Sequence, residues 1–471
     1  MKDRKNTSTR VPTRNKKNNN NSSSGNSYVD TDLAKKIRSG KFKVAIYGLG
    51  HVGSPLASAW LRAGAHVIGV DSSSVVLENA RNGKTHIPEP GVNEAFSRGI
   101  SEKRFFIYSD PVKASQDSYF KLICVPVLLT DSFSADLSAV EQVTTAIARG
   151  LKKGDVVSLN PSVPPGTSED VVLPLLEKES GLKVERDFCM LYNPERIYEG
   201  RAIEDIEIRY PAVVAGAGAK SLDIGTKLYS LIAKKGVIRI TNMRTAEAEK
   251  LLEGVYRDVN IALANEVAKF CERAGVDFWE AREAANSQPF CHIHKPGAGV
   301  GGACIPVYPQ FVLHAANKIG VDCNIVKYGR IINDSMPAYC VKQAIKLINR
   351  SDLSNCTVTL LGLGFRGDVS DTRLSPTYRV IEELKKLKVK AIRVHDPLVT
   401  KDPNLPDDVI LTSNFLGAVS DADLVMLISD HSEYCNITVE TLNGAVLYDG
   451  RGIIDGLRFP AHRFASIGRP S

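Results

Sequence analysis

A single cysteine stands at the end of a glycine-rich segment. Residues 296–306 read PGAGVGGACIP, so Cys304 follows four glycines, Gly301 among them, that keep the thiol at a loop end and outside a core. An accessible thiol near cationic groups ionises and can attack a carbonyl carbon. An isolated cysteine is usually a small buried hydrophobic residue, but the glycine-rich approach favours a nucleophile here.

Two further ionisable residues are candidates to assist such a nucleophile. Lys250 lies early in a long helical segment. Glu195 follows a strand, at the edge of a sheet where α/β proteins build their sites. Residue type alone does not distinguish a functional role from an ordinary one, because most lysines on helices and most glutamates in loops are simply exposed to solvent.

A glycine motif near the N-terminus predicts a dinucleotide site. Residues 48–53 read GLGHVG between a strand and a helix, and Asp71 ends the next strand, 18 residues after Gly53. Gly48 permits the tight turn, Gly50 lets a pyrophosphate approach the backbone, and Gly53, after Val52, lets the helix pack closely on the strand. The helix start attracts phosphate. Asp71 suits the ribose hydroxyls and repels a 2′-phosphate, so we expect NAD and not NADP.

Residues 362–367, GLGFRG, match the same motif a second time. Arg366 and Asp368 alter the phosphate turn, and no acid is found at the usual distance after it. We therefore do not expect a second dinucleotide site, although a nucleotide could bind there.

Strands and helices alternate around these motifs. This alternation predicts an α/β protein with two Rossmann-like, doubly wound domains and parallel sheets. Between them, residues 244–274 repeat apolar positions at helical spacing, which predicts a spine helix of about 45 Å. Apolar runs mark the predicted strands at residues 44–46, 66–70, 122–125, 156–159, 189–192, 212–215, 237–240, 424–428 and 445–448.

The chain divides into four predicted segments. Residues 1–40 form a basic Asn/Ser-rich tail that cannot bury enough apolar surface to become ordered. Residues 41–242 form the first Rossmann-like domain, 243–350 a helical centre, and 351–471 the second Rossmann-like domain.

The net charge of +7 comes from the tail. Residues 1–41 hold eleven Lys/Arg and three Asp, so the rest of the chain sums to −1, which argues against nucleic-acid binding. No apolar run approaches the roughly 20 residues of a membrane span, and no secretory signal is visible. The nine cysteines are scattered without a CxxC pair. We therefore expect a reduced, cytoplasmic protein with no metal site.

Several motifs in one order resemble the UDP-glucose/GDP-mannose dehydrogenase family of nucleotide-sugar dehydrogenases. They include YGLGHVGSPLA, NPERIYEGRAIEDI, GVGGACIP, GLGFRGD and YDGRGIID, and they span nearly everything after the tail. The central stretch through REAANSQPF is most similar to UDP-N-acetylmannosamine and UDP-N-acetylglucosamine dehydrogenases. The resemblance implies that the first domain binds NAD, the centre forms a homodimer, and the last domain binds the UDP part of a UDP-sugar.

The resemblance also implies a reaction and roles for particular residues. The sugar C6 alcohol is oxidised to an acid, and two NAD molecules are reduced. The implied roles are Cys304 as the nucleophile that forms a thiohemiacetal and then a thioester, Lys250 as the oxyanion stabiliser, Glu195 as the activator of water, Ser162 in place of the usual Thr, Arg373 near the NAD phosphates, and Arg366, Arg451 and Gly301 near the substrate.

Four positions depart from the family pattern. Gly254 replaces the usual Asn, Tyr308 replaces the usual Asp four residues after the cysteine, Ala303 replaces a frequent His, and Phe290 replaces an Arg that reaches the neighbouring subunit's site. The retained residues favour an active enzyme of polysaccharide or glycan biosynthesis. The departures leave open a non-catalytic NAD- and sugar-nucleotide-binding regulator, an enzyme that releases the aldehyde, and another sugar such as UDP-glucose.

Overall fold

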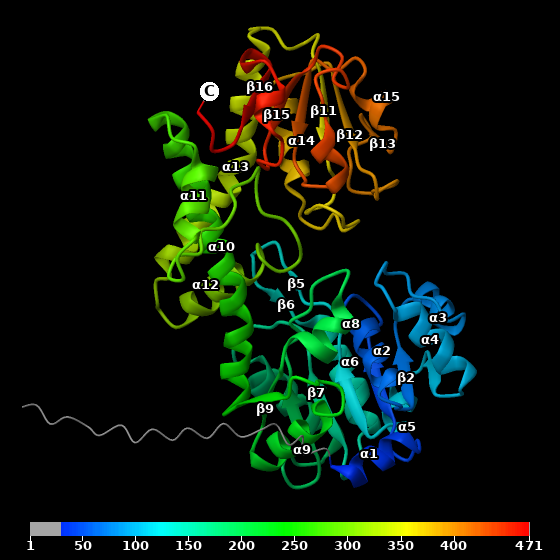
Figure 1. Ribbon diagram of the computed structural model, residues 1–471. Helices are drawn as coiled ribbons and strands as arrows, with labels where there is room; N and C mark the ends of the chain where they lie inside the picture. Colours follow the sequence, from blue (N-terminus) through cyan, green and yellow to red (C-terminus); the bar gives the residue numbers. More distant parts are fainter. Residues whose placement is uncertain (1–29, 471) are drawn as a thin grey trace, which may run out of the picture.

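A computed structural model describes residues 30–470 of the chain (Figure 1). Two large sheets lie in separate domains, and a helical centre joins them, with one long helix running from the first domain toward the second. The predicted fold class, two Rossmann-like domains connected by a spine helix, is confirmed.

The N-terminal sheet has eight strands in the order β10-β9-β8-β7-β4-β1-β2-β3. All neighbours pair in parallel except β8 and β9, so the expectation of a parallel sheet is wrong at this pair. Strands β1, β4, β7 and β8 are buried at every position, which explains their short, mostly apolar sequences. The strands are β1 (Val44–Tyr47), β2 (Val67–Val70), β3 (Phe105–Tyr108), β4 (Phe120–Ile123), β7 (Val156–Leu159), β8 (Cys189–Tyr192), β9 (Ala212–Gly216) and β10 (Val237–Ile240), with a separate hairpin of β5 (Leu128–Leu129) and β6 (Ala135–Asp136).

Helices cover both faces of this sheet (Figure 1). Trp60, fully buried, is the largest side chain that packs from α2 against the sheet. The helices are α2 (Gly53–Arg62), α3 (Ser74–Arg81), α4 (Val92–Ser101), α5 (Pro111–Asp117), α6 (Ser138–Gly150), α7 (Leu173–Ser180), α8 (Ala202–Glu204) and α9 (Ala219–Tyr229).

A short helix, α1 (Thr31–Arg38), precedes the first strand. The Asp30 side chain caps its N-terminus and also pairs with Lys227 at 3.1 Å. Leu33 and Ile37 insert into the core of the first domain. The predicted disordered tail is therefore wrong for residues 31–38, because two apolar side chains one helical turn apart suffice to anchor this segment. Residues 1–29 lie outside the described part of the chain.

The helical centre is organised by α10 (Met243–Ala274), which packs against α13 (Asn324–Ile348). Two buried polar contacts fix their register: Arg330 Nη1 lies 2.5 Å from Asp258 Oδ1, and Asn265 donates to Asn333 at 2.9 Å. The remaining helices are α11 (Phe278–Asn286) and α12 (Tyr308–Lys318). No helix within residues 30–470 is long and apolar enough to cross a membrane.

The C-terminal sheet has six parallel strands in the order β13-β12-β11-β14-β15-β16. Counted from its own first strand, this order is 3-2-1-4-5-6, that of a Rossmann fold. The elements are β11 (Thr357–Leu361), β12 (Ala391–His395), β13 (Val409–Thr412), β14 (Leu424–Leu427), β15 (Val446–Asp449), β16 (Phe464–Ser466), α14 (Pro376–Lys386) and α15 (Phe415–Val419).

Candidate active site

The first glycine turn joins β1 to α2 with the geometry that a pyrophosphate requires. Gly48 has a φ of +96°, and a Cβ on Gly53 would lie 1.8 Å from the Gly48 carbonyl oxygen. A Cβ on Gly50 would meet no atom within 4 Å, so the space above the turn is open. No side chain caps the start of α2, where the positive end of the helix dipole attracts an anion. These features fit the dinucleotide expected from the sequence.

Asp71 follows β2 and holds the same turn. One carboxylate oxygen accepts from the Leu49 amide at 2.8 Å and the other from the Ser73 amide at 2.9 Å. A carboxylate accepts about four hydrogen bonds, and Asp71 is half-buried. It therefore keeps capacity for the two hydroxyls of a ribose.

The glycine-rich segment before Cys304 lies between α10 and the C-terminal domain. The Gly297 amide donates to Asn265 Oδ1 at 2.8 Å, and the Gly302 amide donates to the Arg373 carbonyl at 2.9 Å. A Cβ on Gly301 would lie 2.7 Å from the Leu374 carbonyl oxygen. Gly301 therefore allows close backbone packing, and the segment ends with the Cys304 thiol exposed.

Tyr308 links three of the predicted catalytic residues. It lies at the start of α12, and its amide donates to the Cys304 carbonyl at 3.0 Å. Ser162 Oγ, from the loop after β7, donates to the Tyr308 hydroxyl at 2.7 Å. Lys250 Nζ, from α10, lies 5.9 Å from the centre of the Tyr308 ring. Three elements that are distant in sequence thus meet at one tyrosine.

Lys250 is nearly buried, with 6% of its surface exposed, and its nearest carboxylate is Glu253 Oε2 at 3.6 Å. The positive charge of Lys250 also acts on Glu195. Burial raises the pKa of Glu195 to about 7, although the charges of Lys250 and Arg196 oppose the rise. No hydrogen bond joins Glu195 to Cys304 in residues 30–470.

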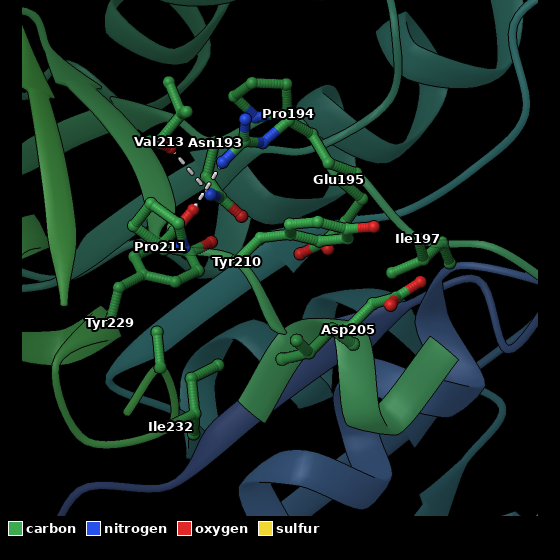
Figure 2. Close-up of a pocket in the computed structure, with 14 residues that line it drawn as sticks. Asn193, Pro194, Glu195, Ile197, Asp205, Tyr210, Pro211, Val213, Tyr229 and Ile232 are labelled. Atoms are coloured by element: carbon green, nitrogen blue, oxygen red, sulfur yellow. Dashed lines mark hydrogen bonds between the residues drawn. The ribbon is translucent and has the colours of Figure 1, made fainter. Parts of the chain in front are cut away.

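A pocket lies behind Glu195, beneath the loop that follows β8 (Figure 2). It encloses about 20 Å³ of space for water, which holds roughly one molecule. Figure 2 shows Glu195, Tyr210 and Asp205 at this pocket. Glu195 is therefore one of the residues that line a space for about one water.

The loop after β8 also connects the two Rossmann-like domains. Glu199 Oε1 lies 3.1 Å from His51 Nδ1 in the first glycine turn and 3.1 Å from Arg373 Nη2 in the C-terminal domain. The Arg366 guanidinium stacks on Tyr198, with 3.7 Å from its central carbon to the ring centre. Glu199 thereby links Arg373 to His51 in the first glycine turn.

Arg451 and Arg366 lie near a common carboxylate. Arg451 Nη2 lies 3.0 Å from Asp430 Oδ1, and the charge of Asp430 also acts on Arg366. A Cβ on Gly297 would lie 2.9 Å from Arg451 Nη1, so this guanidinium reaches the glycine-rich segment. Arg451 thus lies beside the glycine-rich segment, and Arg366 lies beside Tyr198 in the loop after β8.

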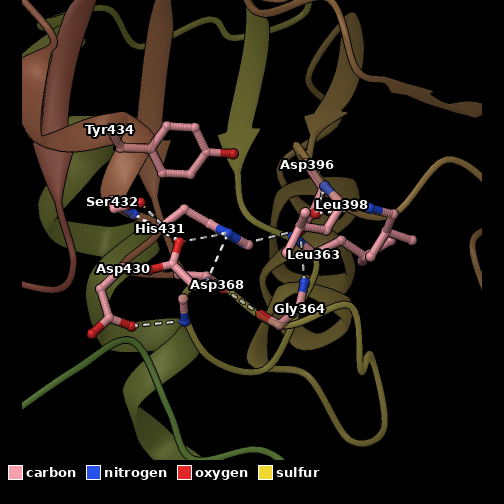
Figure 3. Close-up of polar contacts among 12 residues, drawn as sticks. Leu363, Gly364, Asp368, Asp396, Leu398, Asp430, His431, Ser432 and Tyr434 are labelled. Carbon is pink, nitrogen blue, oxygen red and sulfur yellow. Dashed lines mark hydrogen bonds and ion pairs between the residues drawn. The ribbon is translucent and has the colours of Figure 1, made fainter. Parts of the chain in front are cut away.

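The second glycine turn, between β11 and α14, differs from the first. Asp396, at the end of β12, accepts from the amides of Leu363 and Gly364 at 2.7 and 2.9 Å (Figure 3). No acid stands at the usual distance after this motif, as expected, but a longer loop before α14 places Asp396 at the equivalent position beyond the usual spacing. A Cβ on Gly364 would lie only 2.5 Å from the Val369 carbonyl oxygen. The chain itself fills the space that is open above Gly50.

Asp396 has no capacity left for a ribose. It is fully buried and also accepts from the amides of Leu398 and Val399 and lies 3.3 Å from His431 Nε2. Burial raises the pKa of Asp396, but hydrogen bonds from His431 and backbone amides outweigh this and lower the pKa to about 2. This turn is a structural anchor, as the network in Figure 3 shows.

The sequence did not single out several residues that the structure places in the site. Tyr308 entered only as a departure from a pattern, and the bridge through His51 and Glu199 was not predicted. The spacing of four residues between Cys304 and Tyr308, about one helical turn, is the signal that could have placed these two residues next to each other. Nothing local to the sequence indicates Glu199.

Comparison with known proteins follows the same division of the chain. The family described as "UDP-glucose/GDP-mannose dehydrogenase family" matches with its NAD binding domain over residues 42–233, its central domain over 244–335 and its UDP binding domain over 359–456. A UDP-N-acetyl-D-mannosamine dehydrogenase of Pyrococcus horikoshii is 32% identical over 418 residues, which cover 88% of this chain and 96% of that protein. An NDP-N-acetyl-D-galactosaminuronic acid dehydrogenase of Ralstonia nicotianae is 31% identical over 427 residues, or 89% and 97% of the two chains.

The solved structure of the UDP-D-ManNAc dehydrogenase from Pyrococcus horikoshii superposes with a TM-score of 0.83 at 32% identity and covers 91% of this chain and 99% of that one. The predicted NAD cofactor and the predicted family are both confirmed. The chain belongs to the UDP-glucose/GDP-mannose dehydrogenase family and is an NAD-dependent nucleotide-sugar dehydrogenase.

Proposed function

We propose that this protein oxidises the C6 alcohol of a UDP-N-acetylhexosamine, such as UDP-N-acetyl-D-mannosamine, to the corresponding acid through a covalent intermediate on Cys304. The substrate class is supported by the names of the relatives, several of which are UDP-N-acetyl-D-mannosamine dehydrogenases. The observation that carries the proposal is the exposed Cys304 thiol beside Tyr308, a side chain that also contacts Ser162 and lies near the Lys250 ammonium.

The chain supplies a nucleophile and a cation for the first half of the reaction. Bound NAD would provide the acceptor for the hydrogen and electron pair that leave C6 in each of two oxidations, and the proton of the oxidised hydroxyl passes to water. The Cys304 thiolate attacks the C6 aldehyde, so a sulfur–carbon bond forms and the carbonyl π electrons move to the oxygen. The Lys250 ammonium stabilises this developing negative charge, and its burial strengthens the effect.

Glu195 serves the second half, after oxidation of the thiohemiacetal to a thioester. A base is most effective when its pKa lies near the working pH, and burial raises the pKa of Glu195 to about 7. The carboxylate takes a proton from water as the water oxygen attacks C6. The carbon–sulfur bond then breaks and releases the acid and the thiolate.

Arginines on the C-terminal domain are suited to hold the diphosphate of the substrate. A planar guanidinium binds phosphate oxygens in pairs. Arg366 and Arg451 both lie next to Asp430, near the glycine-rich segment. We assign these two to the UDP-sugar, and Arg373, which Glu199 links to the first glycine turn, to the phosphates of NAD.

The yield of NADH per sugar tests the proposal. Purified protein is given NAD with UDP-ManNAc, UDP-GlcNAc or UDP-glucose separately, beside Cys304→Ala and a matched Cys435→Ala variant that removes the other exposed thiol. We expect two NADH per sugar with an N-acetylhexosamine, lost in Cys304→Ala and kept in Cys435→Ala. One NADH per sugar would indicate aldehyde release. UDP-glucose as the preferred sugar would contradict the substrate, and no NADH despite NAD binding would support the regulatory alternative.

The homodimer is also part of the proposal. Large apolar side chains are exposed along one stripe of α10, including Leu252, Tyr256, Leu263 and Phe270, and others are exposed on α13, such as Ile325. An exposed apolar surface of this kind marks a protein interface. Light scattering should give a dimer for the native chain and a monomer for Leu263→Glu with Phe270→Glu. A native monomer would contradict the assignment.

We also propose a cytoplasmic location, where thiols stay reduced. All nine cysteines are free, and all lie within the described residues. Alkylation of the protein in freshly lysed cells should find them as thiols, and recovery in the oxidised form would contradict this.

A further inference from the structure

Gly254 and Tyr308 form a matched pair. A Cβ on Gly254, in the middle of α10, would lie 2.4 Å from Tyr308 Cδ2 and 3.1 Å from its Cγ. The ring is nearly buried and packs with Leu251, Val307 and Phe311. A glycine in a helix interior costs about 1 kcal/mol relative to alanine, and here it provides the space that the ring occupies.

The position of the ring places its hydroxyl in the reacting centre. Ser162 Oγ donates to the Tyr308 oxygen at 2.7 Å, so the phenol proton remains available for another acceptor. Cys304 lies one helical turn before Tyr308, and the amide of Tyr308 donates to its carbonyl. Burial, followed by the charge of Cys304, raises the pKa of Tyr308 well above its usual value. The phenol therefore stays protonated and acts as a donor.

The Lys250 ammonium fixes the other side of the ring. At 5.9 Å from the ring centre it is within the range of a cation–π contact. Its nearest carboxylate is Glu253, on its own helix, at 3.6 Å. The Tyr308 side chain thus contacts the Ser162 hydroxyl and lies near the predicted oxyanion stabiliser, and the Tyr308 amide bonds to the carbonyl of the predicted nucleophile.

We propose that Tyr308 is a positioning residue for the nucleophile: its phenol, oriented by Ser162 and accommodated by Gly254, donates its hydrogen bond to the Cys304 thiolate. This inference rests on the proposed function and names a further residue of the same site. The contact holds the sulfur at the end of the glycine-rich segment and provides a hydrogen-bond donor to its negative charge.

The alternative is that Tyr308 only fills space. Tyr308→Phe separates the two roles, because it keeps the ring against Gly254 and removes only the hydroxyl. A hydrogen bond to a thiolate raises its population but lowers its nucleophilicity. Loss of the bond should therefore slow alkylation at neutral pH and leave it equal or faster at high pH. If the ring only fills space, the alkylation rates of the native protein and of Tyr308→Phe should not differ at any pH.

The test measures the rate of iodoacetamide alkylation of Cys304 across pH, followed by mass spectrometry of the peptide, in the full-length protein. For Tyr308→Phe we expect a rate about twofold to threefold lower near pH 7, from a lost hydrogen bond of about 1 kcal/mol and a Brønsted slope of about one half. The two profiles should meet or cross near pH 10. Cys435, also exposed, is the internal control and should react equally in both proteins. Identical profiles at Cys304 would overturn the proposal.

A double-mutant cycle tests the role of Gly254. Gly254→Ala in the native chain should lower the unfolding temperature, since its methyl group collides with the Tyr308 ring. In a Tyr308→Ala background the same change should be neutral or stabilising, because the obstacle is gone and alanine favours the helix. Equal destabilisation in both backgrounds would refute the packing on which the inference depends.

These measurements need no sugar, so the two proposals can fail separately. If Cys304-dependent NADH is formed and the alkylation profile of Tyr308→Phe is native, the inference is wrong and the function stands. If no sugar yields NADH but the profile shifts, the contact with Tyr308 is supported and the proposed function is wrong.

Discussion

Three glycine-to-alanine substitutions should separate NAD binding from folding. A methyl group on Gly50 meets no atom within 4 Å, and its φ lies outside the left-handed region, so the ligand-free protein accepts it. A methyl group on Gly53 would lie 1.8 Å from the Gly48 oxygen, and one on Gly364 would lie 2.5 Å from the Val369 oxygen. Gly50→Ala should damage only the site, whereas the other two should damage the fold.

The expected magnitudes follow from linkage. At an NAD concentration of about 100 times Kd, NAD stabilises the native chain by about 2.7 kcal/mol. If the methyl group of Gly50→Ala weakens binding about 100-fold, the same NAD concentration gives only about 0.4 kcal/mol. Without NAD, the free energy of unfolding should stay within about 0.5 kcal/mol of the native value.

Thermal unfolding with and without NAD, supported by calorimetric titration, is the assay. Gly53→Ala and Gly364→Ala should unfold at lower temperature even without NAD, because backbone atoms must shift to accept the methyl group. The reasoning fails if Gly50→Ala binds NAD with native affinity, or if it destabilises the ligand-free protein as much as Gly53→Ala does.

Three further predictions concern other parts of the chain. Deletion of residues 1–29 should leave the unfolding temperature unchanged. Deletion of residues 1–40 also removes Leu33 and Ile37 from the core and should lower the free energy of unfolding in denaturant by about 3 kcal/mol or more. Equal stability of the two deletion variants would contradict the anchoring role of α1. Because burial raises the pKa of Glu195 to about 7, turnover should increase as the pH rises through 7 and the carboxylate forms, and a Glu195→Gln variant with an unchanged pH profile would exclude this base. The same shift makes the pKa of Glu195 higher in the folded state than in the unfolded state. The free energy of unfolding should therefore fall as the pH rises from about 4.5 to 7, and Glu195→Gln should lack this fall. Glu199→Gln removes a negative charge from Arg373 and should tighten NAD binding by about twofold to fivefold; weaker binding by titration would refute a competition between Glu199 and the diphosphate.

The sequence predicted the fold well because most central strands are buried on both faces. Their apolar runs are visible in the residue types alone, as at Val156–Leu159, where prediction and structure agree. The prediction of strands and their directions failed toward the edges of the N-terminal sheet. Strand β3 (Phe105–Tyr108) is half-buried at three of its four positions, and the direction of β9 depends on a neighbour that its own sequence does not reveal. Helix α1 was missed because its two anchoring residues are surrounded by a polar composition.

The site was predictable where its chemistry depends on local pattern. The first glycine turn and its acid follow one another in the chain, and the glycine-rich approach to Cys304 is a continuous segment. The contact between Gly254 and Tyr308 joins two helices and depends on their packing. Taken singly, each substitution suggested a loss of function. The structure shows that the two substitutions are complementary, because Gly254 leaves the space that the Tyr308 ring fills.

The two glycine turns show why a shared motif does not imply a shared function. Both follow a strand, both are held by an aspartate from the next strand, and both contain G-x-G-x-x-G. Asp71 is half-buried with two hydrogen bonds, whereas Asp396 is fully buried with four backbone amides and a histidine against it. The space above Gly50 is open, and that above Gly364 is filled by the chain. A carboxylate with no free acceptor and a turn with no free space cannot bind a dinucleotide. The second glycine turn therefore offers no NAD site, and its domain instead matches the UDP binding domain of the family.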